Sequence, residues 1–100
     1  MIVYVVELDV PLAIREEYMP WLAGHMREML ALPGFVDAET AVRIDPSPPA
    51  GRFVVRVRYR LRDDTAWQAY LADHAPRMRA TGIARFGDSV RATRTLLETT

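Results

Sequence analysis

The sequence predicts an α+β fold in which a four-stranded antiparallel sheet carries both of its helices on one face. Two observations support this class. Apolar and polar residues alternate in four short segments, as in half-buried strands, and apolar residues recur at three- and four-residue steps in two longer segments, as in amphipathic helices. The segments follow one another as strand, helix, strand, strand, helix, strand, and right-handed crossovers fold this order into the split βαβ arrangement. We therefore expect one ferredoxin-like domain over residues 1–100.

The first strand and the first helix have clear sequence signals. Residues 2–9 are rich in β-branched side chains and alternate between two faces. A helix is expected over about residues 12–32, where the apolar spacing is helical. Pro20 lies inside this segment and cannot donate a backbone hydrogen bond, so we expect either a kink there or a helix start nearer Met19. Pro-Gly at 33–34 ends the helix.

The second half of the chain supplies two strands, a helix and a last strand. Strands are expected at 35–44 and 52–61, joined by the proline-rich loop DPSPPAG. Asp63 or Asp64 is suited to cap the second helix, which Pro76 bends or breaks. Gly82 is expected to end that helix, and a connector over 83–88 leads to a fourth strand at 89–97. The chain thus contains every element that the fold needs.

An arginine at every second position marks the third strand, RFVVRVRYRLR. Alternation places these side chains, which we call the arginine ladder, on the sheet face opposite the helices. The ladder consists of Arg56, Arg58, Arg60 and Arg62. In this topology the third strand lies between the first and second, so acidic residues of those strands should lie beside it. They are Glu7, Asp9, Asp37 and Glu39.

The open face of the sheet is expected to be an interface between two copies of the chain. It combines the ladder with apolar residues, which is too apolar for a wet surface and too charged for a core. The apolar residues expected there are Val3, Val5, Phe35 and Val54. The residues predicted to form the dimer interface are Val3, Val5, Glu7, Asp37, Glu39, Arg56 and Arg58. Arg58 should lie deep in the interface and Arg62 near its rim.

Several classes of function are disfavoured by composition. RNA-recognition domains share this element order, but they need exposed aromatic residues on the third strand, and here Phe53 and Tyr59 fall on the helix side of a chain with zero formal net charge. We therefore expect no nucleic-acid partner. There is no cysteine, and His25 and His74 are the only histidines, so we expect no metal site. We also expect no cofactor. No signal-peptide pattern or membrane-length apolar run is present, which favours a cytoplasmic protein without a membrane partner.

Four segments that cover most of the chain carry a family resemblance. They are MIVYVVELDV, WLAGHMREMLALPGF, VRYRLRDDTAWQAYLADHAPRMRATGIARFGD and RATRTLLE. The chain resembles a family of short bacterial proteins of unknown function in the dimeric α+β barrel group, related in fold to the antibiotic-biosynthesis monooxygenases. The resemblance implies a homodimer with two facing sheets inside and the helices outside. Better-characterised members of the group include cofactor-independent, quinone-forming monooxygenases and haem degraders that use an Asn with a Trp and a His; this chain has no Asn.

Related enzymes hold their substrates between the sheet and the helices, so we expect any ligand site there. A bend at Pro76 would open a gap in this layer between Trp67 and His74. The residues predicted to bind a ligand are Tyr4, Tyr59, Trp67, Tyr70 and Arg94, the last only if its side chain turns toward the helices. His74 is the candidate catalytic residue, as a base that accepts a proton from a phenol.

Three functions remain open from the sequence. The first is binding of a small apolar or aromatic molecule between sheet and helices by a cytoplasmic homodimer. The second, which rests on analogy of fold, is a cofactor-independent monooxygenase that acts on a phenol or quinol. The third is a structural or protein-interaction module without a ligand. The residues do not name a ligand or a partner.

Overall fold

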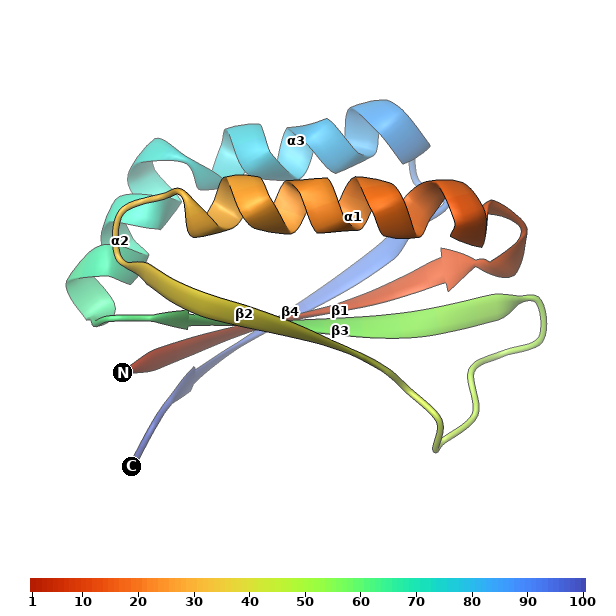
Figure 1. Cartoon of the computed structure of the whole chain (residues 1–100), viewed down its shortest axis with the longest axis horizontal. Coiled ribbons are helices and arrows are strands. Elements are labelled where there is room, and N and C mark those ends of the chain that lie inside the picture. The colour runs from red at the N-terminus through yellow and green to blue at the C-terminus, as the bar shows by residue number, and fades with distance from the viewer.

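The computed structural model describes residues 1–100 and has the predicted order of elements (Figure 1). The strands are β1 (Ile2–Pro11), β2 (Phe35–Val42), β3 (Arg52–Leu61) and β4 (Arg91–Glu98). The helices are α1 (Arg15–Leu30), α2 (Asp64–Asp73) and α3 (Ala75–Phe86), and a 3₁₀ turn, Leu12–Ile14, precedes α1. All strand pairs are antiparallel in the order β2-β3-β1-β4, and the helices lie over one face (Figure 1). The predicted ferredoxin-like fold is confirmed.

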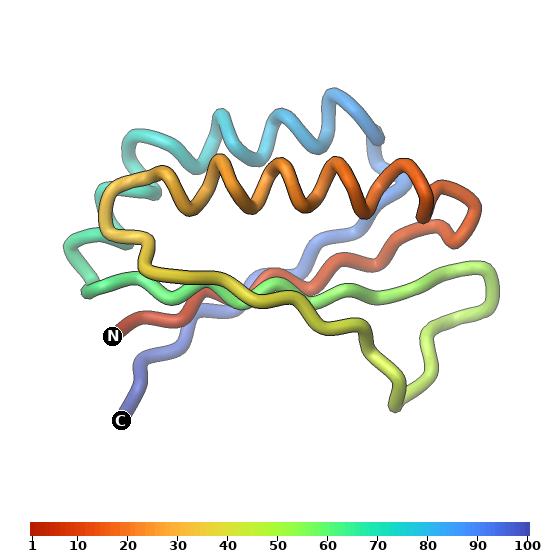
Figure 2. Tube along the Cα trace, viewed as in Figure 1, coloured from red at the N-terminus to blue at the C-terminus, as the bar shows by residue number.

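The two chain ends lie at the same end of the sheet, and the loop between β2 and β3 extends from the opposite end (Figure 2). The backbone N–H of Thr99 donates to the carbonyl of Met1 at 3.0 Å, which continues the pairing of β4 with β1 to the termini. None of the helices has the length and the hydropathy that a bilayer crossing requires.

The core lies between the helices and the helix-facing side of β1 and β3. Alternation along β3 sends Val55, Val57 and Leu61 into this layer, where each is at most 1% exposed. Complete burial of such a side chain contributes roughly 1.5–3 kcal/mol. The helices close the layer from above with the side chains of Tyr18, Leu22, Met29, Trp67, Tyr70 and Met78.

The helix α1 begins at Arg15 and runs through Pro20, so a start near Met19 is wrong. Proline cannot donate a bond to the carbonyl of the residue four positions earlier, and its ring crowds that carbonyl. Tyr18 and Leu22, on either side of Pro20, are both buried against the sheet. Their packing holds the turn in a helical conformation.

The second predicted helix is divided into α2 and α3 at His74, whose φ and ψ are −131° and −34°. The break occurs there because Pro76 is placed in the first turn of α3, where its missing N–H needs no partner within the helix. The side chain of Asp63 caps α2 by accepting the backbone N–H of Ala66 at 2.9 Å, so Asp63 is the predicted cap that is used.

The predicted helix end at Gly82 and the connector over 83–88 are wrong. The helix α3 continues through Gly82 to Phe86 and ends at Gly87, which has a φ of +63°. At Gly82 the helix α3 comes close to α1, since a Cβ there would lie 3.2 Å from the Trp21 ring, which is tighter than ordinary contact. A glycine inside a helix pattern thus marks a close approach here, not a stop.

The open face carries three of the four predicted apolar residues. Val3, Val5 and Val54 are each at most 6% exposed and lie outside the core layer. Val3 pairs with Arg60 and Val5 with Arg58, so the apolar stems of the arginines can cover them. Phe35 does not lie on this face. A register shift just after Phe35 reverses the alternation, and its ring packs at 5.8 Å from that of Tyr59 in the core layer.

The arginine ladder lies beside the predicted acidic residues of β1 and β2. Arg58 is 2.8 Å from Glu39, and Nε of Arg60 donates to Oδ1 of Asp37 at 2.7 Å. Arg56 lies 3.9 Å from Glu7. Asp9 differs from the prediction, since it pairs with Arg52 at the start of β3 and not with a ladder residue. Chiefly through its hydrogen bond, Arg60 lowers the pKa of Asp37.

Candidate functional site

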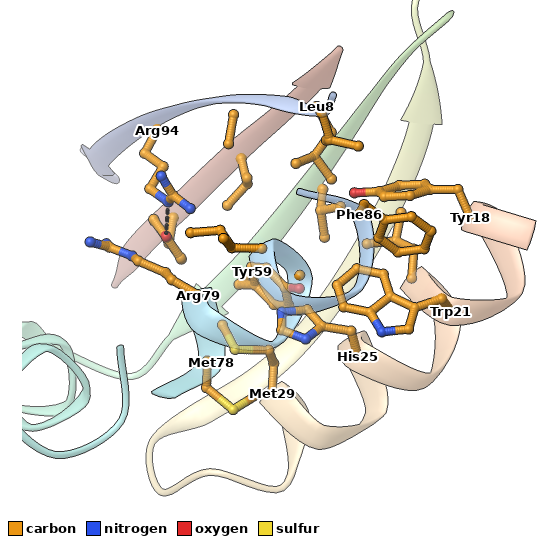
Figure 3. A pocket seen from close by; sticks show the side chains of 18 of the residues that line it. Leu8, Tyr18, Trp21, His25, Met29, Tyr59, Met78, Arg79, Phe86 and Arg94 are labelled. Carbon is orange, nitrogen blue, oxygen red and sulfur yellow. Dashed lines mark hydrogen bonds between the residues drawn. The ribbon is translucent and has the colours of Figure 1, made fainter. Parts of the chain in front are cut away.

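A pocket of about 110 Å³ lies between α1, α3 and the helix-facing side of the sheet (Figure 3). Twenty residues line it, and 15 of them are hydrophobic. The sheet lines the pocket with residues of its two central strands, β1 and β3, and of the exposed edge strand β4. A mostly apolar concavity with a few polar groups is typical of a small-molecule site.

One end of the pocket is aromatic. Tyr18 and Trp21 are three residues apart on α1 and therefore share a face. Phe86, from the last turn of α3, packs its ring 4.9 Å from that of Tyr18 and 5.2 Å from that of Trp21 (Figure 3). Burial raises the pKa of Tyr18 to about 12, so its hydroxyl is neutral at physiological pH. These rings can pack against an apolar or aromatic ligand.

His25 lines the pocket one helical turn beyond Trp21. The two rings are stacked, with centroids 5.0 Å apart and planes at 17°. Nδ1 of His25 is buried and has no hydrogen-bond partner in the chain. Burial lowers the pKa of His25, against a smaller opposing effect of Glu28. The imidazole is therefore neutral at pH 7 and has unused hydrogen-bonding capacity.

Two arginines lie at the other end of the pocket. Arg94 of β4 pairs with Val6, which places it on the helix side, and its Nε donates to the Tyr4 hydroxyl at 3.1 Å (Figure 3). Arg79 of α3 has a buried Nε without a partner. Burial raises the pKa of Tyr70 to about 12, and the charges of both guanidinium groups oppose this increase. No aspartate or glutamate lines the pocket.

The structure brings together four of the five predicted ligand-binding residues. Tyr4, Tyr59, Tyr70 and Arg94 all line the pocket. Burial also raises the pKa of Tyr59, so its hydroxyl stays protonated at physiological pH. Trp67 lies outside, with its ring packed 4.8 Å from that of Tyr4 in the core.

His74 does not line the pocket either. It is placed at the junction of α2 and α3, and its Nδ1 is 2.9 Å from a terminal nitrogen of Arg77. The break before Pro76 thus turns the chain at His74 and does not open the gap that the sequence suggested. The predicted roles of the site residues stay predictions.

The pocket residues that were missed from the sequence include Trp21, His25 and Arg79. A signal for two of them was present, since Tyr18, Trp21 and His25 follow one another at helical spacing on one face of α1. Arg79 had no such signal, because it follows a helix break whose position the sequence does not define. No three histidine, aspartate or glutamate side chains converge as metal ligands would.

Comparisons with known proteins identify the fold and the family. Similar solved structures include the heme degrader MhuD of Mycobacterium tuberculosis, with two hemes bound in its active site, at 19% identity and a TM-score of 0.70 over 99% of this chain and 95% of that chain. A Deinococcus radiodurans protein assigned as an antibiotic biosynthesis monooxygenase has 12% identity and a TM-score of 0.73 over 100% and 93%. A variant of the cofactor-independent oxygenase SnoaB of Streptomyces nogalater has 17% identity and a TM-score of 0.65 over 98% and 92%.

At these identities the likeness concerns the fold alone, which is that of the dimeric α+β barrel group. No curated protein sequence matches the chain. A protein-family match extends over residues 1–100, and the chain therefore belongs to the family described as Domain of unknown function (DUF4286).

Proposed function

We propose that this protein binds a small, largely apolar or aromatic molecule in the pocket between α1, α3 and the sheet. The carrying observation is that 15 of 20 lining residues are hydrophobic, while hydrogen-bonding groups of α1, α3 and β4 converge on the same space. The volume of about 110 Å³ is of the order of the roughly 150 Å³ engineered cavity that takes up benzene. It is well below the roughly 300 Å³ and more of pockets that enclose drug-sized ligands. We therefore propose a ligand with one ring and a short substituent, and not a haem.

The competing function is a structural module without a ligand. Two buried atoms without a hydrogen-bond partner in the chain argue against this function. They are Nδ1 of His25 and Nε of Arg79. Each such group destabilises the fold by about 1–3 kcal/mol. A core with a purely structural role would be more stable with apolar residues at both positions.

A pocket-filling substitution tests the proposal. Ala92 of β4 lines the pocket and Ala80 of α3 does not, so Ala92→Met should fill the pocket and Ala80→Met is the matched control. With 4-ethylphenol as probe, we expect calorimetry to show binding to the wild type and to Ala80→Met, and binding weaker by about tenfold or more to Ala92→Met. Equal binding to all three proteins, or no binding to the wild type, would remove the pocket as the ligand site.

A second candidate function is a cofactor-independent monooxygenase, and the observation that favours it is the neutral, unpaired imidazole of His25 in the pocket. His25 would accept the proton of a bound phenol. The phenolate would react with dioxygen, one oxygen atom entering the ring to give a quinone and the other leaving as water. Oxygen uptake with a panel of phenols should fall in His25→Ala and persist in His74→Ala. Absence of uptake, or an equal effect of both substitutions, would exclude this activity.

We also propose that the chain is a homodimer through the open face of the sheet. Arginines are common at protein interfaces, and the ladder lies beside buried valines on this face. Leu97, which pairs with Val3 and so lies on the same face, is 48% exposed and would be covered by a second copy. Light scattering should report about twice the 11.4 kDa of one chain. A monomer that persists at high concentration would contradict this assembly.

A further inference from the structure

We infer that the ligand carries an acid group, in the simplest case a carboxylate, which is bound between Arg79 and Arg94 at the end of the pocket opposite the aromatic cluster. This inference rests on the proposed function and names the chemical class of the ligand: an apolar, single-ring acid.

The two arginines come from different elements and reach the same end of the pocket. Arg79 is on α3 and Arg94 is on β4, and Figure 3 shows both side chains on the side of the pocket away from Tyr18 and Phe86. Arg94 is held by its hydrogen bond from Nε to Tyr4. That bond uses one nitrogen of the guanidinium and leaves the two terminal ones for a ligand.

The charge of this end of the pocket is not balanced within the chain. Seven ion pairs are present, and neither Arg79 nor Arg94 takes part in any of them. The pocket lining contains both guanidinium groups and no acidic side chain. By contrast, each arginine of the ladder has an acidic residue within 4 Å. A cation next to an apolar space favours an anion as its partner, because water is partly excluded there.

Arg79 provides a second, independent observation. Its Nε is buried without an acceptor, although a guanidinium nitrogen is a strong donor. A planar carboxylate can accept from two nitrogens of one guanidinium at once. A bound carboxylate therefore supplies both the missing acceptor and the missing negative charge.

The apolar remainder of the pocket restricts the rest of the ligand. A ring attached to the acid by a short chain would extend from the arginines toward Trp21 and Phe86, past the imidazole of His25. A phenol does not satisfy the same end of the pocket, because with a pKa of about 10 it is uncharged at neutral pH.

A matched pair of probes tests the inference without altering the protein. We compare 3-phenylpropanoate with its neutral amide, 3-phenylpropanamide, by calorimetry near neutral pH. The wild type should bind the acid about tenfold or more tightly than the amide. Added salt should reduce this ratio, because the attraction is partly screened.

Charge-removing variants locate the effect. Arg79→Gln and Arg94→Gln should each reduce the acid-to-amide ratio toward one while amide binding is kept. Arg77→Gln, on the same helix as Arg79, and Arg91→Gln, on the same strand as Arg94, are matched controls outside the pocket and should keep the full ratio.

The inference is supported if the wild type prefers the acid and if both pocket variants lose this preference. Equal binding of acid and amide by the wild type, or a ratio that the pocket variants leave unchanged, overturns it. In either of those cases, binding of 4-ethylphenol would leave the proposed function standing. Failure of acid, amide and 4-ethylphenol alike would remove both.

Discussion

Replacement of His25 by leucine should make the protein more stable and less functional. Leucine has a similar volume, so the substitution removes the unpaired Nδ1 without opening a cavity. An unsatisfied buried polar group costs about 1–3 kcal/mol. The ring stacking with Trp21 is lost at the same time, and such a pair contributes roughly 0.5–1.5 kcal/mol. The net expectation is a gain of about 1 kcal/mol in the free energy of unfolding, or about 5 °C in Tm for a domain of this size.

The stability gained by His25→Leu over the wild type should increase as the pH falls. Burial lowers the pKa of His25 in the folded protein below the 6.5 of the unfolded chain. Between these two values the unfolded chain binds more protons than the folded one, so acidification destabilises the wild type in this window. The stability that neutral His25 gives the wild type is complete above the pKa of the unfolded chain, and it is lost as the pH falls toward the pKa of the folded protein. A leucine cannot titrate, and the variant should lack this loss.

Urea denaturation followed by tryptophan fluorescence measures both effects, at about pH 7.5 and about pH 5.5, with stability compared at a constant m value. His74→Leu is the control for loss of the other histidine. A variant less stable than the wild type at the higher pH would show that Nδ1 is satisfied in the native protein. Parallel stability of wild type and His25→Leu at both pH values would show that His25 keeps its ordinary pKa on folding.

Three further predictions concern the fold and the assembly. Gly34→Ala should lower the free energy of unfolding by about 2–4 kcal/mol, because φ is +85° and a Cβ would collide with the first turn of α2. Gly51→Ala, with φ +77° and open space around it, should lower it by about 1 kcal/mol. Equal losses in thermal unfolding would contradict the collision. Asp63→Ala removes the helix cap and should lower the free energy of unfolding by about 1 kcal/mol, whereas Asp63→Asn should lower it much less. Chemical denaturation that shows both variants to be as stable as the wild type would contradict a role of the cap. Arg58→Ala should weaken dimer association by about 3–5 kcal/mol, and Arg62→Ala by less than about 1 kcal/mol. Equal, small effects of both variants in sedimentation equilibrium would show that the ladder is solvated in the assembly.

Most of the sheet could be predicted because alternation is a local property of a strand. The face of Val57 and the opposite face of Arg58 follow from the sequence alone, and so does the pairing of β3 with both neighbours. Phe35 was placed on the wrong face because a single extra residue in the register reverses every side chain beyond it. No residue type in this part of the sequence indicates the register shift.

The site was harder to predict because it depends on how the helices end. The sequence correctly indicates a break near Pro76, but whether His74 then faces the sheet or the solvent depends on one backbone conformation at the junction. The orientation of Arg94 depends on the register of β4 against β1, which its weakly alternating sequence leaves open. His25 could have been found, since it follows Trp21 on the same face of α1 as Tyr18.

The two tryptophans allow a direct test of the central claim that the ligand site lies between α1, α3 and the sheet. Trp21 lines this pocket and Trp67 does not, and the chain has no other tryptophan. In a titration of ¹⁵N-labelled protein with 4-ethylphenol, the two indole N–H resonances report on the two positions separately. We predict that the resonance of Trp21 shifts and that of Trp67 stays in place. A shift of the Trp67 resonance alone, or of neither, would contradict the assignment of the pocket.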